Sequence, residues 1–176
     1  GFEKVRIVED TAQPGAAWST PPTGMPYPMF CTLLKGEIEV SDSQIITFVE
    51  PMIGFPALRQ FILYQTTAGP LSWLQSVEDA QTAFCVLSPF AAGLDPDLQI
   101  APVDAEQIRA AGEKDLDVWT VVVLDADREK VRTNLRAPIL VGRTSRLAKQ
   151  VLLDDPKLPI QFLLHKHLAA TAGRAC

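Results

Sequence analysis

Residues 131–155, VRTNLRAPILVGRTSRLAKQVLLDD, contain two β-prone apolar runs separated by a polar TNL corner and a rigid AP step. Val131 and Thr133 are β-branched residues that favour a strand. Asn134 carries an amide that can close a turn on its own backbone. Pro138 removes a backbone donor where the second run begins. We therefore predict a strand, a corner and a second strand at the edge of a sheet.

The rest of the chain is also rich in short β-prone runs. Charged or polar residues alternate with apolar ones over residues 37–41, which predicts a half-buried strand. A second strand is predicted over residues 45–49, with Ile46 and Phe48 facing away from Thr47, and SDSQ between the two has the composition of a turn. Further strands are predicted at residues 61–64, 71–75, 83–87, 118–125, 131–135, 139–141 and 149–153, with a hairpin loop at 125–130.

Helical signals are few. Asp104 as N-cap, Gln107 three residues later and Gly112 as terminator predict a short helix over residues 105–111. Ser76 with Asp79 predicts a single turn, and apolar spacing after Pro159 predicts a helix in the tail. Many short, mostly antiparallel strands with one or two short helices indicate a mainly β fold, either a small antiparallel pseudo-barrel or a strongly curved sheet.

The length of 176 residues suits one domain with its own core. We expect a Pro-rich arm at residues 1–29, extended and with little internal hydrogen bonding, a single β domain at 30–164 and a tail at 165–176. No apolar run is long enough for a membrane span and no signal segment opens the chain, so we expect a cytoplasmic protein without membrane contact. Three widely spaced cysteines predict no disulfide framework, and Cys85 in an apolar run is expected to be buried.

The net charge of −5 is unevenly distributed. Residues 30–100 hold two basic residues against eight acidic ones, whereas the charges from residue 101 onward alternate in sign. Because nucleic acid requires a contiguous basic surface, direct binding to it is not expected. An acidic face favours a basic protein partner by steering and complementarity. Carboxylates that only keep the protein in solution are an equally good explanation.

The sequence lacks the common catalytic and nucleotide-binding motifs, so we predict no enzyme, no cofactor and no metal. His165 and His167 would point in different directions on a helix and lack further ligands. The adjacent carboxylates at 78–79 and 154–155 are more typical of solvated loops than of an acid–base pair. Phe55 and Trp73 lie in β-prone runs, where aromatic side chains usually pack inward.

Three ordered motifs resemble the FliW family of flagellar assembly factors. TNLRAPI followed by AKQVLLDD resembles the family's C-terminal TVNLxAPI and QVxL. KGEIEVSDSQIITFVEPMIGFP resembles its opening, and LQSVEDAQTAFCVLSP its central LQSxE segment. The likeness spans roughly residues 30–164. This chain departs from the family's GxPGF corner, with Pro51 and Ile53 in place of its first glycine and its proline, while Gly54 and Phe55 are kept.

The resemblance implies a pseudo-barrel and a protein that binds newly made flagellin in the cytoplasm. When free of flagellin, such a protein binds the translational repressor CsrA, so that flagellin mRNA is translated, and no catalysis is involved. The alternatives are a flagellin chaperone that does not bind CsrA and a small-ligand-binding β-barrel module. We expect a monomer. The partner-binding candidates are Gly54, Phe55, Gln75, Glu78, Asp79, Asn134 and a more exposed Arg136, although Gln75 and Asn134 could equally serve only the backbone around them.

Overall fold

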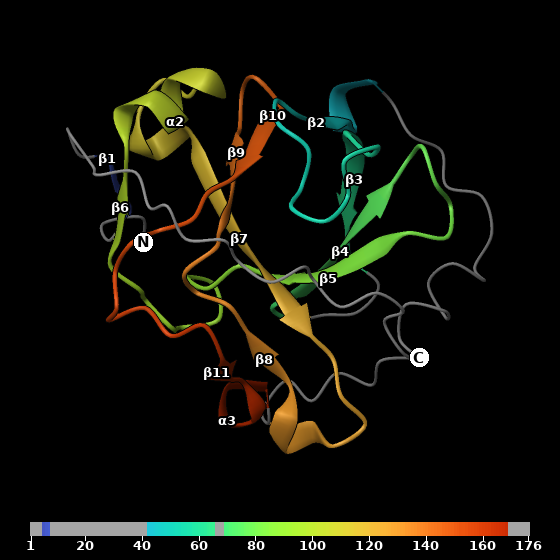
Figure 1. Ribbon diagram of the computed structural model, residues 1–176, viewed down its shortest axis with the longest axis vertical. Helices are drawn as coiled ribbons and strands as arrows, with labels where there is room; N and C mark the ends of the chain where they lie inside the picture. Colours follow the sequence, from blue (N-terminus) through green and yellow to red (C-terminus); the bar gives the residue numbers. More distant parts are fainter. Residues whose placement is uncertain (1–4, 8–41, 66–68, 169–176) are drawn as a thin grey trace.

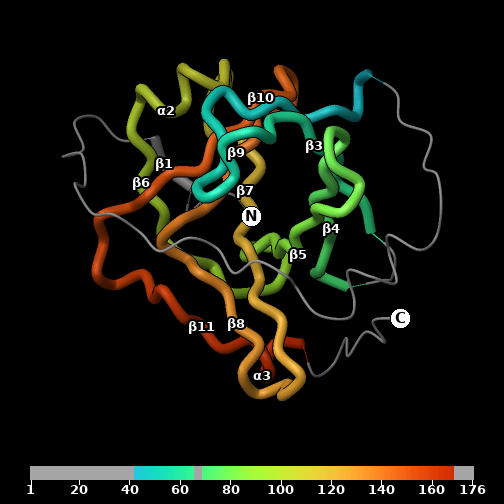
Figure 2. The backbone as a smooth tube through the Cα atoms, turned by 45° about the vertical axis from the view of Figure 1, so that its right-hand side comes forward, coloured from blue at the N-terminus to red at the C-terminus, as the bar shows by residue number. Residues whose placement is uncertain are grey.

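Seven strands close into a barrel in the computed structural model, which describes residues 5–7, 42–65 and 69–168 (Figure 1). Figure 2 shows the same ring from a second direction. In order around the barrel the strands are β7 (Leu116–Val123), β5 (Ala83–Leu87), β4 (Leu71–Ser76), β3 (Gln60–Tyr64), β2 (Ile46–Phe48), β10 (Leu147–Gln150) and β9 (Ile139–Gly142). All neighbouring pairs are antiparallel except β2 and β10, which are parallel. The predicted mainly β pseudo-barrel is confirmed.

The alternation of apolar and polar residues explains how the strands face the core. In β2, Ile46 and Phe48 are fully buried and Thr47 between them is half-exposed, as predicted. Every residue of β5 is buried, because the barrel interior covers one face and a second apolar cluster covers the other. Inside the barrel, Phe61 packs edge-on against Phe48 with ring centroids 5.2 Å apart. Cys85 faces the second cluster, and its burial raises the pKa of its thiol to about 12.

At the predicted corner, residues 133–139 bulge out between two pairings with the same strand, β7. Strand β8 (Arg132–Thr133) pairs Thr133 with Val122, and β9 pairs Ile139 with Trp119. Three steps along β7, from 119 to 122, therefore face six steps on its partner, from 133 to 139, an excess of three residues. The predicted position at a sheet edge is wrong, because β8 lies between β7 and β11 and β9 lies between β7 and β10.

Short elements surround the barrel. β1 (Val5–Ile7) pairs in parallel with β6 (Leu98–Ile100), and β11 (Phe162–Leu163) pairs with β8. Residues 5–7 of the expected arm thus lie along a strand of the domain, which agrees with an extended arm that makes few hydrogen bonds of its own. The predicted strand at 37–41 and the rest of the arm lie outside the described residues. The remaining elements are the helices α2 (Pro102–Gln107) and α3 (His165–Leu168) and the 3-10 helices η1 (Asp42–Gln44), η2 (Glu113–Asp115) and η3 (Arg128–Lys130).

Both helix predictions need correction. Helix α2 begins at Pro102, whose ring favours the first helical turn, so Asp104 lies inside that turn and is not its N-cap. The carboxylate of Asp104 instead accepts from Lys149 Nζ at 2.7 Å. The predicted helix after Pro159 is wrong over residues 162–163, which pair with β8, and helix begins only at His165. In contrast, Ser76 closes a turn as predicted, because its Oγ accepts from the Glu78 and Asp79 amides.

Candidate protein-binding surface

Two loops that carry most of the predicted site residues are tied together by Glu78. Its Oε1 accepts from the backbone amides of Arg59 and Gln60, at 2.6 Å each. The Val77 amide adds a hydrogen bond to the Gln60 carbonyl at 3.0 Å. Residues 50–60 and 76–82 therefore form one surface, which we call the loop surface.

Glu78 and Asp79 place two negative charges on the loop surface. Hydrogen bonds from the Gln60 and Arg59 amides hold the pKa of Glu78 below its ordinary value. The Thr82 hydroxyl, 2.6 Å from Asp79 Oδ2, and the Gln81 amide do the same for the pKa of Asp79. Both carboxylates are therefore ionised at neutral pH, and their positions are fixed by backbone donors.

Gln75 supports the loop surface from below. Its side chain is buried, and Nε2 donates to the carbonyls of Ser76 and Thr82, both at 3.0 Å. These bonds close the base of the 76–82 loop. Gln75 therefore holds the loop that presents Glu78 and Asp79.

Gly54 and Phe55 form the tip of the 50–60 loop. Gly54 has a φ of +90°, a left-handed conformation that favours glycine. The Phe55 amide donates to the Met52 carbonyl at 2.9 Å, and its ring meets Phe84 edge-on with centroids 4.8 Å apart. Phe55 is half-buried against the barrel core, which confirms the inward packing expected of it.

Asn134 and Arg136 lie on a second surface, formed by residues 134–138 and 153–159 and here called the corner surface. Asn134 Oδ1 accepts from the Arg136 amide at 2.9 Å, so the side chain does close a turn on its own backbone. Arg136 Nε donates to the Leu158 carbonyl at 3.0 Å and Nη2 to that of Pro156 at 3.4 Å. Arg136 is half-buried and not the more exposed residue that we expected.

Gln150 joins the two surfaces, and sequence reasoning missed this role. Its side chain is 8% exposed; Oε1 accepts from the Ile53 amide and Nε2 donates to the Ala137 carbonyl, both at 3.3 Å. The 50–60 loop and the corner are therefore held against the same strand, β10. The signal in the sequence was a glutamine in the AKQVLL run, where an apolar residue would be expected.

Lys149, the preceding residue of β10, binds the opposite side. Its Nζ lies 2.7 Å from Asp104 Oδ1, 2.6 Å from Gln107 Oε1 and 3.8 Å from Glu50 Oε1. Lys149 therefore links α2 to Glu50 at the start of the loop surface, while Gln150, which faces the other way along β10, joins the loop surface to the corner surface. The Lys149 and Asp104 side chains are 13% and 15% exposed, so this ion pair is well shielded.

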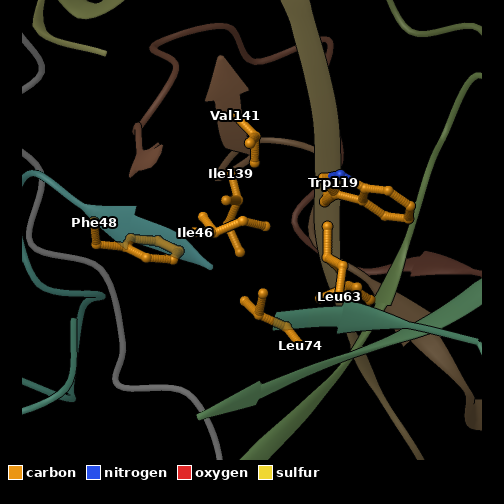
Figure 3. A pocket seen from close by; sticks show the side chains of 8 residues that line it. Ile46, Phe48, Leu63, Leu74, Trp119, Ile139 and Val141 are labelled. Atoms are coloured by element: carbon orange, nitrogen blue, oxygen red, sulfur yellow. The ribbon is translucent and has the colours of Figure 1, made fainter. Parts of the chain in front are cut away.

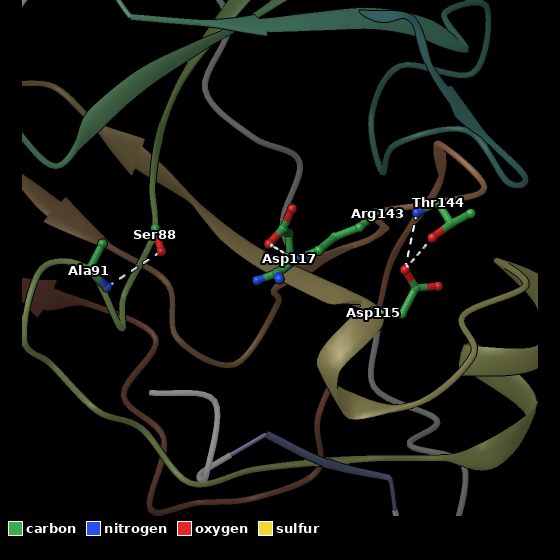
Figure 4. A network of polar contacts seen from close by, with 6 residues as sticks. All are labelled: Ser88, Ala91, Asp115, Asp117, Arg143 and Thr144. Atoms are coloured by element: carbon green, nitrogen blue, oxygen red, sulfur yellow. Dashed lines mark hydrogen bonds and ion pairs between the residues drawn. The ribbon is translucent and has the colours of Figure 1, made fainter. Parts of the chain in front are cut away.

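A separate polar network lies at the start of β7 (Figure 4). Asp115 Oδ1 accepts from the amide and hydroxyl of Thr144, and Oδ2 accepts from the Ala111 amide. Arg143 Nε donates to Asp117 Oδ1 at 2.7 Å. The Ala111 amide is the first cause that holds the pKa of Asp115 below its ordinary value. These bonds fasten the β9–β10 turn to β7, which is a structural role.

The barrel interior is filled by side chains. Eight side chains meet there and leave no space between them for a water molecule. Figure 3 shows apolar side chains pointing into the barrel interior from several strands, together with Trp119. The Trp119 Nε1 has no hydrogen-bond partner among the described residues. The lining residues are Ile46, Phe48, Leu63, Leu74, Val86, Trp119, Ile139 and Val141.

Residues 5–7, 42–65 and 69–168 contain neither a metal-binding cluster nor a helix that could span a membrane. There, no group of three or more His, Cys, Asp or Glu side chains is arranged to hold a metal ion. None of the described helices has the length and apolar character to cross a membrane.

Comparison with known proteins connects this geometry to a family. The family model described as FliW protein matches residues 30–164. Curated proteins named flagellar assembly factor FliW are similar: that of Caldicellulosiruptor saccharolyticus is 33% identical over 76% of this chain and 88% of its own. That of Caldicellulosiruptor bescii is 34% identical with the same coverage. A crystal structure titled as the flagellar assembly factor FliW superimposes with a TM-score of 0.68 at 28% identity, over 73% of this chain and 91% of that one.

Proposed function

The chain belongs to the FliW family of flagellar assembly factors. We propose that it acts in the cytoplasm as a switch between two protein partners. It binds flagellin, and when free of flagellin it binds a CsrA-like translational repressor so that flagellin mRNA is translated. Binding of one partner excludes or weakens binding of the other, so the flagellin concentration sets the fraction available to the repressor.

The loop surface carries this proposal. Glu78 and Asp79 stay ionised and are held in place by backbone and hydroxyl donors, so no side-chain entropy need be lost to position them. An RNA-binding repressor has basic surfaces, and fixed acidic charges increase its rate of encounter. The only basic side chain on this surface, Arg59, directs its Nη1 to the carbonyls of Phe48 and Val49.

Accessible apolar side chains on the loop surface favour binding of a protein rather than of a small ion. Val77 is 40% exposed beside Glu78, and Phe55 is partly accessible at the tip of the neighbouring loop. Interfaces commonly combine an apolar centre with a charged rim. Gly54, Phe55, Glu78 and Asp79 therefore belong to the proposed contact, with Gln75 as a positioning residue. Asn134 and Arg136 extend it across the Gln150 link to the corner surface.

The filled barrel interior favours this proposal over a small-ligand-binding module. Ligand sites in barrels need a cavity with a few convergent polar groups. Here the space inside is narrow and its lining is apolar apart from the Trp119 indole nitrogen.

Pairwise binding of purified proteins tests the proposal. The chain is titrated with flagellin and with CsrA from the same organism, each by isothermal calorimetry. Saturable binding of both is expected. Binding of flagellin alone would favour the chaperone alternative, and binding of neither would contradict the proposal. Asp79→Asn should weaken binding of CsrA, whereas Asp95→Asn, a matched change at an exposed carboxylate outside the loop surface, should not.

A further inference from the structure

The edge of β6 is occupied by the chain's own N-terminal residues. Val5 pairs with Leu98, Arg6 with Gln99 and Ile7 with Ile100, all in parallel (Figure 1). Among the described residues, β6 pairs with no other strand. The occupant comes from outside residues 30–164, the part that matches the family model. The two-stranded sheet is therefore made by adding a segment of the N-terminal arm to the family's domain.

Strand β6 is a fixed platform for such an addition. Leu98 and Ile100 are 1% and 0% exposed and belong to an apolar cluster with Ile108 and Leu116, while Gln99 between them is exposed. Packing of alternate side chains holds the strand, and its backbone donors and acceptors along one edge face β1. When such an edge is uncovered, it readily accepts an extended segment from another chain.

β1 fits β6 through its pattern of apolar and charged residues rather than through particular side chains. Residues 5–7 read apolar, charged, apolar, in register with the buried, exposed, buried pattern of β6. Backbone hydrogen bonds supply most of the recognition in strand addition, and side chains at alternate positions supply the rest. A three-residue pairing is short, and residues 8–41 separate β1 from the next described element. Such a contact can be displaced by a competing strand.

We propose that the β6 edge is a strand-addition site and that residues 5–7 are its built-in occupant. The partner that it fits is an extended peptide segment with apolar residues at alternate positions, which binds when the chain's own segment leaves. This site lies on β6 and does not depend on the flagellin and CsrA proposal for the loop surface.

A labelled peptide of residues 1–12, GFEKVRIVEDTA, tests the site with two proteins: the full chain and a chain that lacks residues 1–12. Fluorescence anisotropy should show saturable binding to the truncated chain. Binding to the full chain should be at least about tenfold weaker, because its own segment must first leave. A peptide of the same composition in scrambled order is the control. Equal affinity for the two chains, or equal binding of the scrambled peptide, would overturn the proposal.

A disulfide variant of the full chain keeps the test valid if truncation prevents folding. Arg6→Cys with Gln99→Cys places two cysteines directly opposite each other, with Cys31 and Cys176 changed to Ser. The disulfide should form, and the oxidised protein should not bind the peptide, whereas the reduced protein should bind as the full chain does. Arg6→Cys with Gln81→Cys is the matched pair that should not link. Failure of the first pair to link, or undiminished peptide binding by the linked protein, contradicts the proposal.

Discussion

The Glu78 Oε1 accepts the backbone N–H of Arg59 at 2.6 Å, across 19 residues of sequence. The same oxygen accepts from Gln60, so one carboxylate both carries the acidic charge of the loop surface and holds its two loops together. Replacement of Glu78 by Lys therefore changes two properties at once. A substitution that removes only the charge is therefore needed to separate its effect from that of the hydrogen bonds between the loops.

Glu78→Gln removes the charge and keeps an acceptor oxygen. We expect this variant to melt close to the wild type but to bind CsrA with an association rate about two- to fivefold lower at low salt, since charges at an interface rim act mainly on the rate of encounter. Glu78→Ala should both associate more slowly with CsrA and melt at a lower temperature than the wild type. Stopped-flow association at several salt concentrations and thermal melting distinguish them. An unchanged association rate in Glu78→Gln would show that the charge of Glu78 does not speed the encounter with CsrA.

The pH dependence of stability follows from the same hydrogen bonds. The pKa of Glu78 is lowered from its ordinary value of 4.5 by the Gln60 and Arg59 amides. Its stabilising contribution is therefore present above pH 4.5 and is lost as the pH falls through the lowered folded-state pKa. The difference in free energy of unfolding between wild type and Glu78→Ala should shrink on acidification in this window. Urea titrations from pH 7 to 2 measure it, and a difference that grows on acidification would contradict the prediction.

Gln150→Met should be the more destabilising of two glutamine replacements. It leaves the Ile53 amide and the Ala137 carbonyl without their partner, which costs about 1–3 kcal/mol when such groups are buried. Gln81→Met, at an exposed position, should stay within about 0.5 kcal/mol. Chemical denaturation measures both. Equal stability of the two variants would show that Gln150 does not hold the loop to the corner.

Asn134→Ala should cost about 1 kcal/mol, because the Arg136 amide loses its acceptor, whereas Asn134→Asp keeps one. Arg136→Ala should cost a similar amount through loss of its bonds to the Leu158 and Pro156 carbonyls. Arg132→Ala, whose bond to Lys130 is exposed, is the control and should stay within about 0.5 kcal/mol. If Asn134→Ala melts as the wild type does yet loses one partner, the corner is a direct contact rather than a support.

Gly142→Ala should destabilise the chain by about 1–3 kcal/mol, as overpacking does in a tight interior. A Cβ there would lie 2.8 Å from the Ile108 carbonyl oxygen and would also meet the Ser145 side chain. Adding Ser145→Ala relieves the side-chain clash but not the clash with the backbone. The double variant should therefore remain less stable than Ser145→Ala alone in thermal melting, and equal stability would contradict this reading.

Local patterns predicted the barrel strands, with β10 placed two residues too late, but they missed the short strands β1, β6 and β11 and did not give the pairings. The bounds of β5 match the prediction because its apolar run is bordered by turn residues. Closure of the barrel through the parallel pair β2–β10 joins residues about a hundred positions apart, which no local pattern encodes. The excess of three residues at the corner likewise becomes visible only when both registers on β7 are known.

At the candidate site, too, local contacts could be predicted from the sequence and long-range contacts could not. Asn134 and Gln75 act on backbone within a few residues, and this possibility could be stated from the sequence. Gln150 acts on Ile53, 97 residues away, and Lys149 on Asp104, 45 residues away. Asp104 suits an N-cap or a first helical turn equally well by type, and the start of α2 at Pro102 shows which applies.

Competition between the two partners is the most direct test of the proposed switch. Labelled CsrA is bound to the full chain at a concentration near the Kd, and flagellin is added while anisotropy is recorded. We expect flagellin to release CsrA until the anisotropy reaches that of free repressor. The flagellin concentration needed should rise with the CsrA concentration or reach a limit set by the coupling between the two partners. A stable complex of all three proteins in which the affinity for CsrA is unchanged would contradict the proposed switch.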